Sequence, residues 1–128
     1  MNARTVLAMA GLAGASGVGL GAFGAHLLAA RLTPADLASF ETGARYQMLH
    51  AVALLGLAAW IERHPAPRLA WAARALGLGI VVFSGSLYAL VLTGHRWLGA
   101  VTPIGGVALI IGWILVMAEG ASTMDRAG

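Results

Sequence analysis

Long uncharged segments constrain this chain of 128 residues more than any other feature. Four stretches contain no Asp, Glu, Lys or Arg: Thr5–Ala30, Tyr46–Ile61, Ala75–His95 and Trp97–Ala118. A helix needs roughly 20 mostly apolar residues to cross the hydrocarbon core of a bilayer, which is about 30 Å thick. The sequence therefore predicts an all-α fold, an integral membrane four-helix bundle that occupies residues 1–128 as a single domain.

Composition supports this class and argues against several functions. Charged residues make up 10% of the chain, whereas soluble domains average about 25%. A formal net charge of +3 is too small for a nucleic-acid footprint. We therefore expect the lipid bilayer as a partner and no nucleic acid. The chain has no cysteine, which excludes a disulfide framework, a thiolate metal site and a cysteine nucleophile.

The predicted spans cover about residues 5–30, 46–61, 70–92 and 103–118. The apolar region of a secretory signal is about 7–15 residues long, and the first run is much longer, so we expect a true span there. An even number of spans places both termini on one side, here called side A. Five arginines flank the spans on side A and three on the opposite side B. The positive-inside rule then predicts cytoplasmic termini in a bacterial inner membrane.

The connection between the first two spans carries a helix signal of its own. Thr33–Asp36 has capping-box spacing, with proline at the first helical position. We expect a short amphipathic helix over about residues 34–42 in the side B interface, ended by Gly43. The alternative is one continuous helix from Pro34 to Ile61. It would extend a second span that is only about 24 Å long by itself.

Glycines on the predicted spans indicate close helix packing. Helices in a bilayer gain no hydrophobic energy from one another, so close backbone approach has to supply the contact energy. Gly17 and Gly21 form a small-xxx-small pair on the first span. The glycines expected in helix contacts are Gly17, Gly21, Gly24, Gly85, Gly105 and Gly106. The same residues would serve a single bundle, a homo-oligomer or a larger membrane complex.

Polar residues inside the spans fall mostly toward side B. Ionisable residues within a membrane are energetically expensive and are candidate functional residues by default. Thr102 is additionally expected to be the N-cap of the last span, with Pro103 at its first helical position. The candidate pocket residues are His26, Tyr46, Gln47, His50, Ser86, Thr93 and Thr102.

Three interpretations of this cluster remain open. It could be a hydrogen-bonded structural knot, or a transport, ligand-binding or lipid-binding site that uses His26, Gln47 and His50. It could also be a bis-histidine haem site for electron transfer, formed by His26 and His50. The sequence has no Gly-x-Ser-x-Gly elbow, which argues against a hydrolase. We expect a non-enzymatic structural or accessory protein with no cofactor, metal site or catalytic residue.

Five motifs follow one another over residues 5–118. They are Gly21–His26, then Thr42–Gly43 with Tyr46–Gln47 and His50, then Phe83–Tyr88, Thr102–Gly106 and Gly112–Trp113. Together they resemble the YgdD-like family of small bacterial membrane proteins, a domain of unknown function with a relative among small mitochondrial transmembrane proteins of animals. The resemblance implies a four-helix inner-membrane protein with no assigned reaction. The chain departs from the family pattern at Leu27, where glycine is common, and in Glu119–Gly128, which lacks the usual basic cluster.

Overall fold

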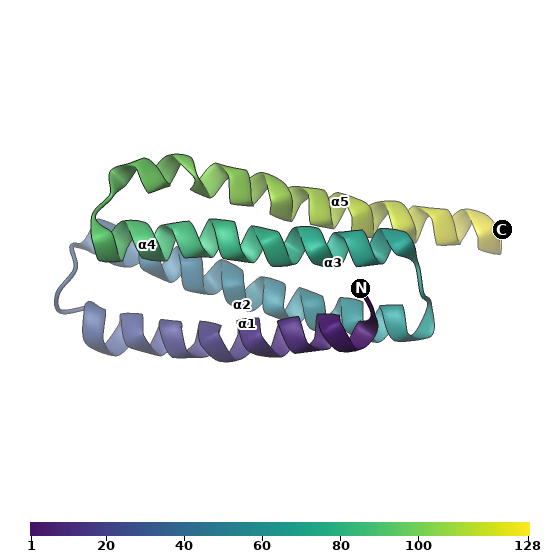
Figure 1. The fold of residues 1–128 in the computed structure, drawn as a ribbon, viewed down its shortest axis with the longest axis horizontal. Helices are drawn as coiled ribbons and strands as arrows, with labels where there is room; N and C mark the ends of the chain where they lie inside the picture. The colour runs from purple at the N-terminus through teal and green to yellow at the C-terminus, as the bar shows by residue number, and fades with distance from the viewer.

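Four long helices make up the computed structural model, which describes residues 1–128 (Figure 1). The first is α1 (Ala3–Phe23), which continues through a π-helical turn, η1 (Gly24–Leu28), and the second is α2 (Pro34–Arg63). The third comprises α3 (Pro67–Gly79), a second π-helical turn, η2 (Ile80–Ser84), and α4 (Gly85–Thr93). A 3-10 turn, η3 (Arg96–Ala100), leads into α5 (Thr102–Ala127). The predicted all-α fold with four helices is confirmed.

Successive helices are antiparallel, so the two chain termini lie at the same end of the bundle (Figure 1). α1 packs along α2, and α3 packs along α5. The two pairs are joined mainly through contacts of α2 with α3, η2 and α4. The end with the termini corresponds to side A, and the end with the turns after η1 and α4 corresponds to side B.

Local capping explains where two of the helices begin and end. The Thr33 side chain accepts a hydrogen bond from the backbone N–H of Asp36 at 3.2 Å, and Pro34 opens α2, as predicted. Gly94 has φ 76°, a left-handed conformation that favours glycine, and it ends α4. These two signals fix the side B turns before α2 and after α4.

α2 is a single unbroken helix, so the predicted break at Gly43 is wrong and residues 34–42 form its first turns. Gly43 instead allows α4 to come close. A Cβ atom at this position would lie 2.9 Å from the ring of Tyr88. The loss of about 1 kcal/mol for a glycine inside a helix is therefore offset by packing that a larger residue would prevent.

The main hydrophobic core lies in the half of the bundle nearer side A. All four long helices contribute, with α2 and α3 supplying most of the residues. The small side chains of Ala72 and Ala73 are fully buried, which brings α3 close to its neighbours. The core residues are Val6, Ala10, Leu54, Leu57, Ala58, Ile61, Leu69, Ala72, Ala73, Leu76, Ile80 and Leu109.

Large apolar side chains also cover the outer surface. Leu12 is 74% exposed and Met117 is 68% exposed. Three helices are long and apolar enough to cross a membrane, namely Ala3–Leu28, Pro67–Thr93 and Arg96–Ala127. Only 17% to 33% of the most apolar 18-residue stretch of each helix is buried within the chain. A helix that is apolar all round and this exposed needs a hydrocarbon environment. The outer face is therefore suited to lipid.

The glycines differ in what they contact. A Cβ atom at Gly17 would lie 2.8 Å from Met48 Sδ, and one at Gly24 would lie 2.9 Å from the Phe40 ring. One at Gly105 would overlap the backbone of Phe83, and one at Gly106 would make only ordinary contact with the Phe83 ring. Gly21 and Gly85 have open space around the Cβ position, so they are not close-packing glycines within this chain. The first helix therefore contacts α2 through Gly17 in α1 and Gly24 in η1, two turns apart, whereas Gly21 has no neighbour at its Cβ position.

Candidate functional site

His50 connects α2 to α5 through its imidazole ring. Nε1–H of Trp113 donates a hydrogen bond to His50 Nε2 at 3.0 Å, and His50 Nδ1 lies 2.7 Å from the Tyr46 carbonyl oxygen. An indole N–H can only donate and a carbonyl can only accept. His50 must therefore be the neutral tautomer with its proton on Nδ1. Both ring nitrogens are occupied in a side chain that is 6% exposed.

This arrangement does not fit a bis-histidine haem site. Ligation by His50 Nε2 would require Trp113 to release its hydrogen bond. His26 lies in η1, where it is exposed and forms no side-chain hydrogen bond within the chain. The structure therefore does not bring His26 and His50 together as one site. Trp113 is 49% exposed and reaches His50 from the outer part of α5.

Gln47 joins α1, α2 and α4. Its Nε2 atom donates to the Ala13 carbonyl at 2.9 Å and to Ser16 Oγ at 2.7 Å, and its Oε1 accepts from the Tyr88 hydroxyl at 2.7 Å. Ser16 in turn donates to the Leu12 carbonyl at 2.7 Å. Every donor of this chain of hydrogen bonds has an acceptor. The amide side chain therefore fastens three helices.

Two serines near η2 make further links between helices. Ser84 Oγ donates to the Gly43 carbonyl at 2.7 Å, which ties η2 to α2. Ser86 Oγ lies 2.6 Å from Thr102 Oγ1, which ties α4 to the start of α5. The predicted N-cap role of Thr102 is wrong, because Thr102 is the first residue of α5 and Val101 is the N-cap. The Thr102 hydroxyl contacts Ser86 and the Leu98 carbonyl instead of a backbone N–H of α5.

The predicted cluster is thus divided among separate contacts. Gln47 turns toward α1 and α4, and His50 turns toward α5. Tyr46 is 40% exposed, with its ring 4.6 Å from that of Phe83. Thr93 bonds back to the Ala89 carbonyl within its own helix. One pocket that gathers all seven predicted residues is not formed.

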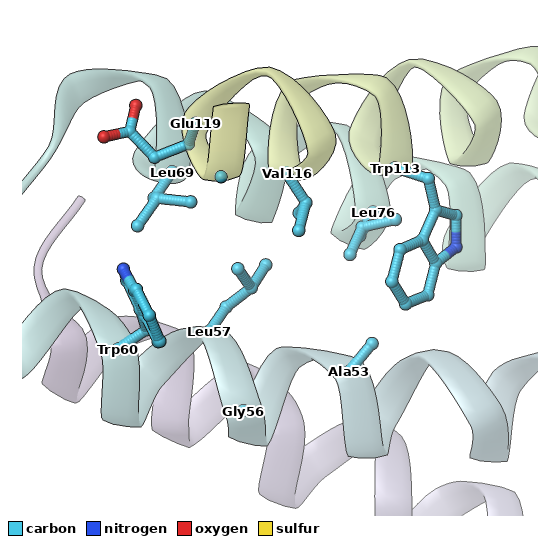
Figure 2. Close-up of a pocket in the computed structure, with 10 residues that line it drawn as sticks. Ala53, Gly56, Leu57, Trp60, Leu69, Leu76, Trp113, Val116 and Glu119 are labelled. Carbon is cyan, nitrogen blue, oxygen red and sulfur yellow. The ribbon is translucent and has the colours of Figure 1, made fainter. Parts of the chain in front are cut away.

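An apolar groove between α2 and α5 extends from the Trp113 ring toward side A (Figure 2). Its volume is about 300 Å³. Trp113 stands at one end and Trp60 at the other, and Glu119 lies near the Trp60 end (Figure 2). The lining residues are Ala53, Gly56, Leu57, Trp60, Leu69, Leu76, Trp113, Val116, Glu119 and Gly120.

Glu119 is the buried acidic residue that the sequence analysis missed. It is 8% exposed. Its carboxylate lies 3.1 Å from an Arg68 nitrogen and 3.9 Å from an Arg126 nitrogen. Arg68 also donates to Ser122 Oγ at 2.9 Å and to the Ala118 carbonyl at 3.3 Å. The only signal in the sequence is that Glu119 ends the last uncharged run. Its partner Arg68 is far away along the chain.

Comparison with known proteins gives one consistent family. The family described as "Protein of unknown function (DUF423)" matches residues 20–106. The UPF0382 inner membrane protein YgdD of Escherichia coli is 41% identical over 100% of this chain and 97% of its own length. UPF0382 membrane proteins of Staphylococcus epidermidis and Staphylococcus aureus are 45% and 46% identical, over 87% and 78% of this chain and 88% and 81% of their own lengths. No solved structure matches the chain.

The match along the full length agrees with the four-helix fold, the lipid-suited surface and the motifs noted in the sequence. The relatives' names identify them as membrane proteins and assign no reaction. The chain therefore belongs to the UPF0382 (DUF423) family and is a multi-pass inner-membrane protein.

Proposed function

We propose that this chain is a non-enzymatic structural or accessory membrane protein whose internal polar residues hold the bundle together. The observation that carries the proposal is that no buried side-chain nitrogen or oxygen lacks a hydrogen-bond partner. A catalytic or transport site needs groups free to meet a substrate. Here the groups best suited to such chemistry, His50 and Gln47, are occupied by Trp113 and by α1 and α4.

The proposal includes four spans rather than three. α2 is 30 residues long, which corresponds to about 45 Å of helix. It carries charges near both ends and an uncharged middle from Tyr46 to Ile61. α1 packs along α2, so a bilayer crossed by α1 would also be crossed by α2. The charged ends would then lie at the two interfaces.

Topology reporters test this part directly. Four spans place both termini on the same side, and the positive-inside rule favours the cytoplasm. A fluorescent protein fused to the C-terminus should fluoresce, while alkaline phosphatase inserted at Gly94 should be active in the periplasm of an expression host. An inactive phosphatase at Gly94 with a periplasmic C-terminus would overturn the proposed topology.

Ligand binding is a second candidate function, and one observation favours it. A groove of about 320 Å³ between α1 and the α3–α4 helix is lined by Ser16, Gln47 and Tyr88 among apolar residues. The free acceptor positions on the Tyr88 hydroxyl and Gln47 could receive a ligand donor. A ligand that stabilises the purified protein but not the Gln47→Leu variant would favour this function over the structural one.

The structural role of these residues predicts a different result. Loss of His50 or Gln47 should lower the stability of the purified protein without changing its spectrum of bound small molecules. If both variants unfold at the wild-type temperature, the structural role is wrong.

A further inference from the structure

Two glycines keep the groove between α2 and α5 open. Gly56 on α2 and Gly120 on α5 line it, and a Cβ atom at either position would meet no heavy atom within 4 Å. The floor consists of the buried side chains of Leu57, Leu69 and Leu76. The stretch from Ala53 to Trp60 rises roughly 10 Å along α2. The groove is therefore a short, recessed strip of hydrocarbon surface.

Positive charge gathers where this groove reaches side A. A second hollow shares Trp60 and Glu119 with the groove and is lined by Arg63, Arg68 and Arg126. Glu119 pairs with Arg68 and Arg126, whereas Arg63 is exposed and forms no ion pair in the structure. Three guanidinium groups against one carboxylate leave a net charge of +2 at the mouth, with His64 counted as neutral.

We propose that this groove is a binding site for one anionic phospholipid. An acyl chain lies in the strip between Trp60 and Trp113, and the headgroup phosphate is held by the arginines at the side A mouth, chiefly Arg63 and Arg126. Arginine matches phosphate oxygens with a planar fork of N–H donors. Basic pockets between membrane helices are a recurring way to bind anionic headgroups.

The dimensions favour a lipid chain over a protein helix. A docked helix needs a long groove for its anchors, and this one ends after two turns of α2 at the Trp113 ring. Lipid bound on a smooth apolar face would also have no fixed cationic partner. Here the charged mouth and the apolar strip are continuous, because Glu119 and Trp60 line both.

The two tryptophans at the ends of the groove provide the probe. The remaining two, Trp71 and Trp97, are replaced by phenylalanine in the full chain, so that only Trp60 and Trp113 fluoresce. The protein is placed in phosphatidylcholine nanodiscs that contain a fixed fraction of lipid with brominated acyl chains, which quench nearby indoles. The brominated lipid is either phosphatidylglycerol or phosphatidylcholine.

We expect brominated phosphatidylglycerol to quench with a relative binding constant about 5-fold to 25-fold above that of brominated phosphatidylcholine. Each arginine near an anionic headgroup contributes about a factor of five, and Arg126 is already paired with Glu119 at 3.9 Å. Gly56→Leu or Gly120→Leu should abolish this preference by filling the groove. The matched control is Gly19→Leu on α1, which also has open space at the Cβ position. It should retain the preference.

The charged mouth is tested in the same assay. Arg63→Gln combined with Arg126→Gln should bring the preference down to about one, whereas Arg4→Gln, at the same end of the bundle but outside the mouth, should not. Inorganic phosphate at matched ionic strength should leave the preference intact.

Three results would overturn the proposal. Equal quenching by the two lipids would mean that the groove holds only bulk lipid. Loss of the preference on addition of inorganic phosphate would assign the site to a free anion. Weak quenching by both lipids that rises as the protein is diluted would show that a second copy covers the groove.

Discussion

Trp113 donates its indole N–H to the ring nitrogen Nε2 of His50 across 3.0 Å, and this contact links α5 to α2. The same imidazole lies 2.7 Å from the Tyr46 carbonyl through Nδ1. An ionisable side chain within the bundle is thereby held neutral, in one tautomer and one orientation. Polar groups used in this way specify which helix faces meet, in a bundle whose surfaces are otherwise similarly apolar.

The His50–Trp113 contact should contribute to stability as a pair. Trp113→Phe and His50→Phe each remove it, and a double-mutant cycle in detergent should give a coupling free energy of about 1 kcal/mol, as for other hydrogen bonds between membrane helices. Nitrogen NMR of the wild type should show Nε2 unprotonated and Nδ1 protonated. A coupling near zero would show that the contact does not stabilise the bundle.

Gln47 should contribute more to the free energy of unfolding than its partner Tyr88, because the Gln47 side chain forms hydrogen bonds to two other helices. Gln47→Leu leaves the Tyr88 hydroxyl without its acceptor and should lower the free energy of unfolding by about 2 kcal/mol. Tyr88→Phe should cost about 1 kcal/mol by itself. In the double variant the loss should be close to that of Gln47→Leu. Full additivity would contradict the hydrogen-bond chain.

Two glycines that look alike in sequence should respond in opposite ways. Gly105→Ala places a methyl group on the Phe83 backbone and should destabilise the protein by about 1–3 kcal/mol through overpacking. Gly85→Ala enters open space inside a helix and should be neutral or stabilise by up to about 1 kcal/mol. Thermal unfolding of the two variants measures the difference. Equal effects would argue against the η2–α5 contact at Gly105.

Substitution of Arg68 should lower the free energy of unfolding more than substitution of its partner Glu119. Arg68→Met leaves a carboxylate that is 8% exposed without its nearest cation. Since an uncompensated buried charge is costly, we expect a loss of roughly 1–3 kcal/mol in the free energy of unfolding. Glu119→Gln removes the charge and keeps a hydrogen-bonding group, so its cost should be smaller. The reverse order would show that Arg68 is held mainly by Ser122 and the α5 backbone.

The extent of the helices could be predicted because length and charge dictate it. The uncharged runs gave four helices, and the Thr33 cap gave the start of the second helix. What failed was the interruption at Gly43. The low helix propensity of glycine favours a break at Gly43 only weakly. Packing of the Tyr88 ring, which comes from a helix far along the chain, against Gly43 is the stronger effect.

The rotation of each helix could not be predicted in the same way. In a helix that is apolar on every side, the sequence does not indicate which face points to the core. The rotation of the helix is therefore set by its packing against the neighbouring helices. His50 and Trp113 are 63 positions apart in the sequence. Their contact depends on that rotation, as does the separation of His26 from His50. The candidate polar residues were therefore assigned to one pocket, whereas the structure divides them among several contacts between helices.

The π-helical turn at Ile80–Ser84 absorbs one residue more than the regular helix on either side of it needs. A π turn holds about one residue more than an α turn. Deletion of one residue within 80–84 would let regular α geometry return, and the side chains from Gly85 onward would keep their orientation relative to α3. Tyr88 would then still meet Gln47, and Ser86 would still meet Thr102. Deletion of one residue from α3 would instead rotate the two ends of this helix by about 100° relative to each other. A relative that lacks one residue at the π turn should therefore keep the same contacts between its helices.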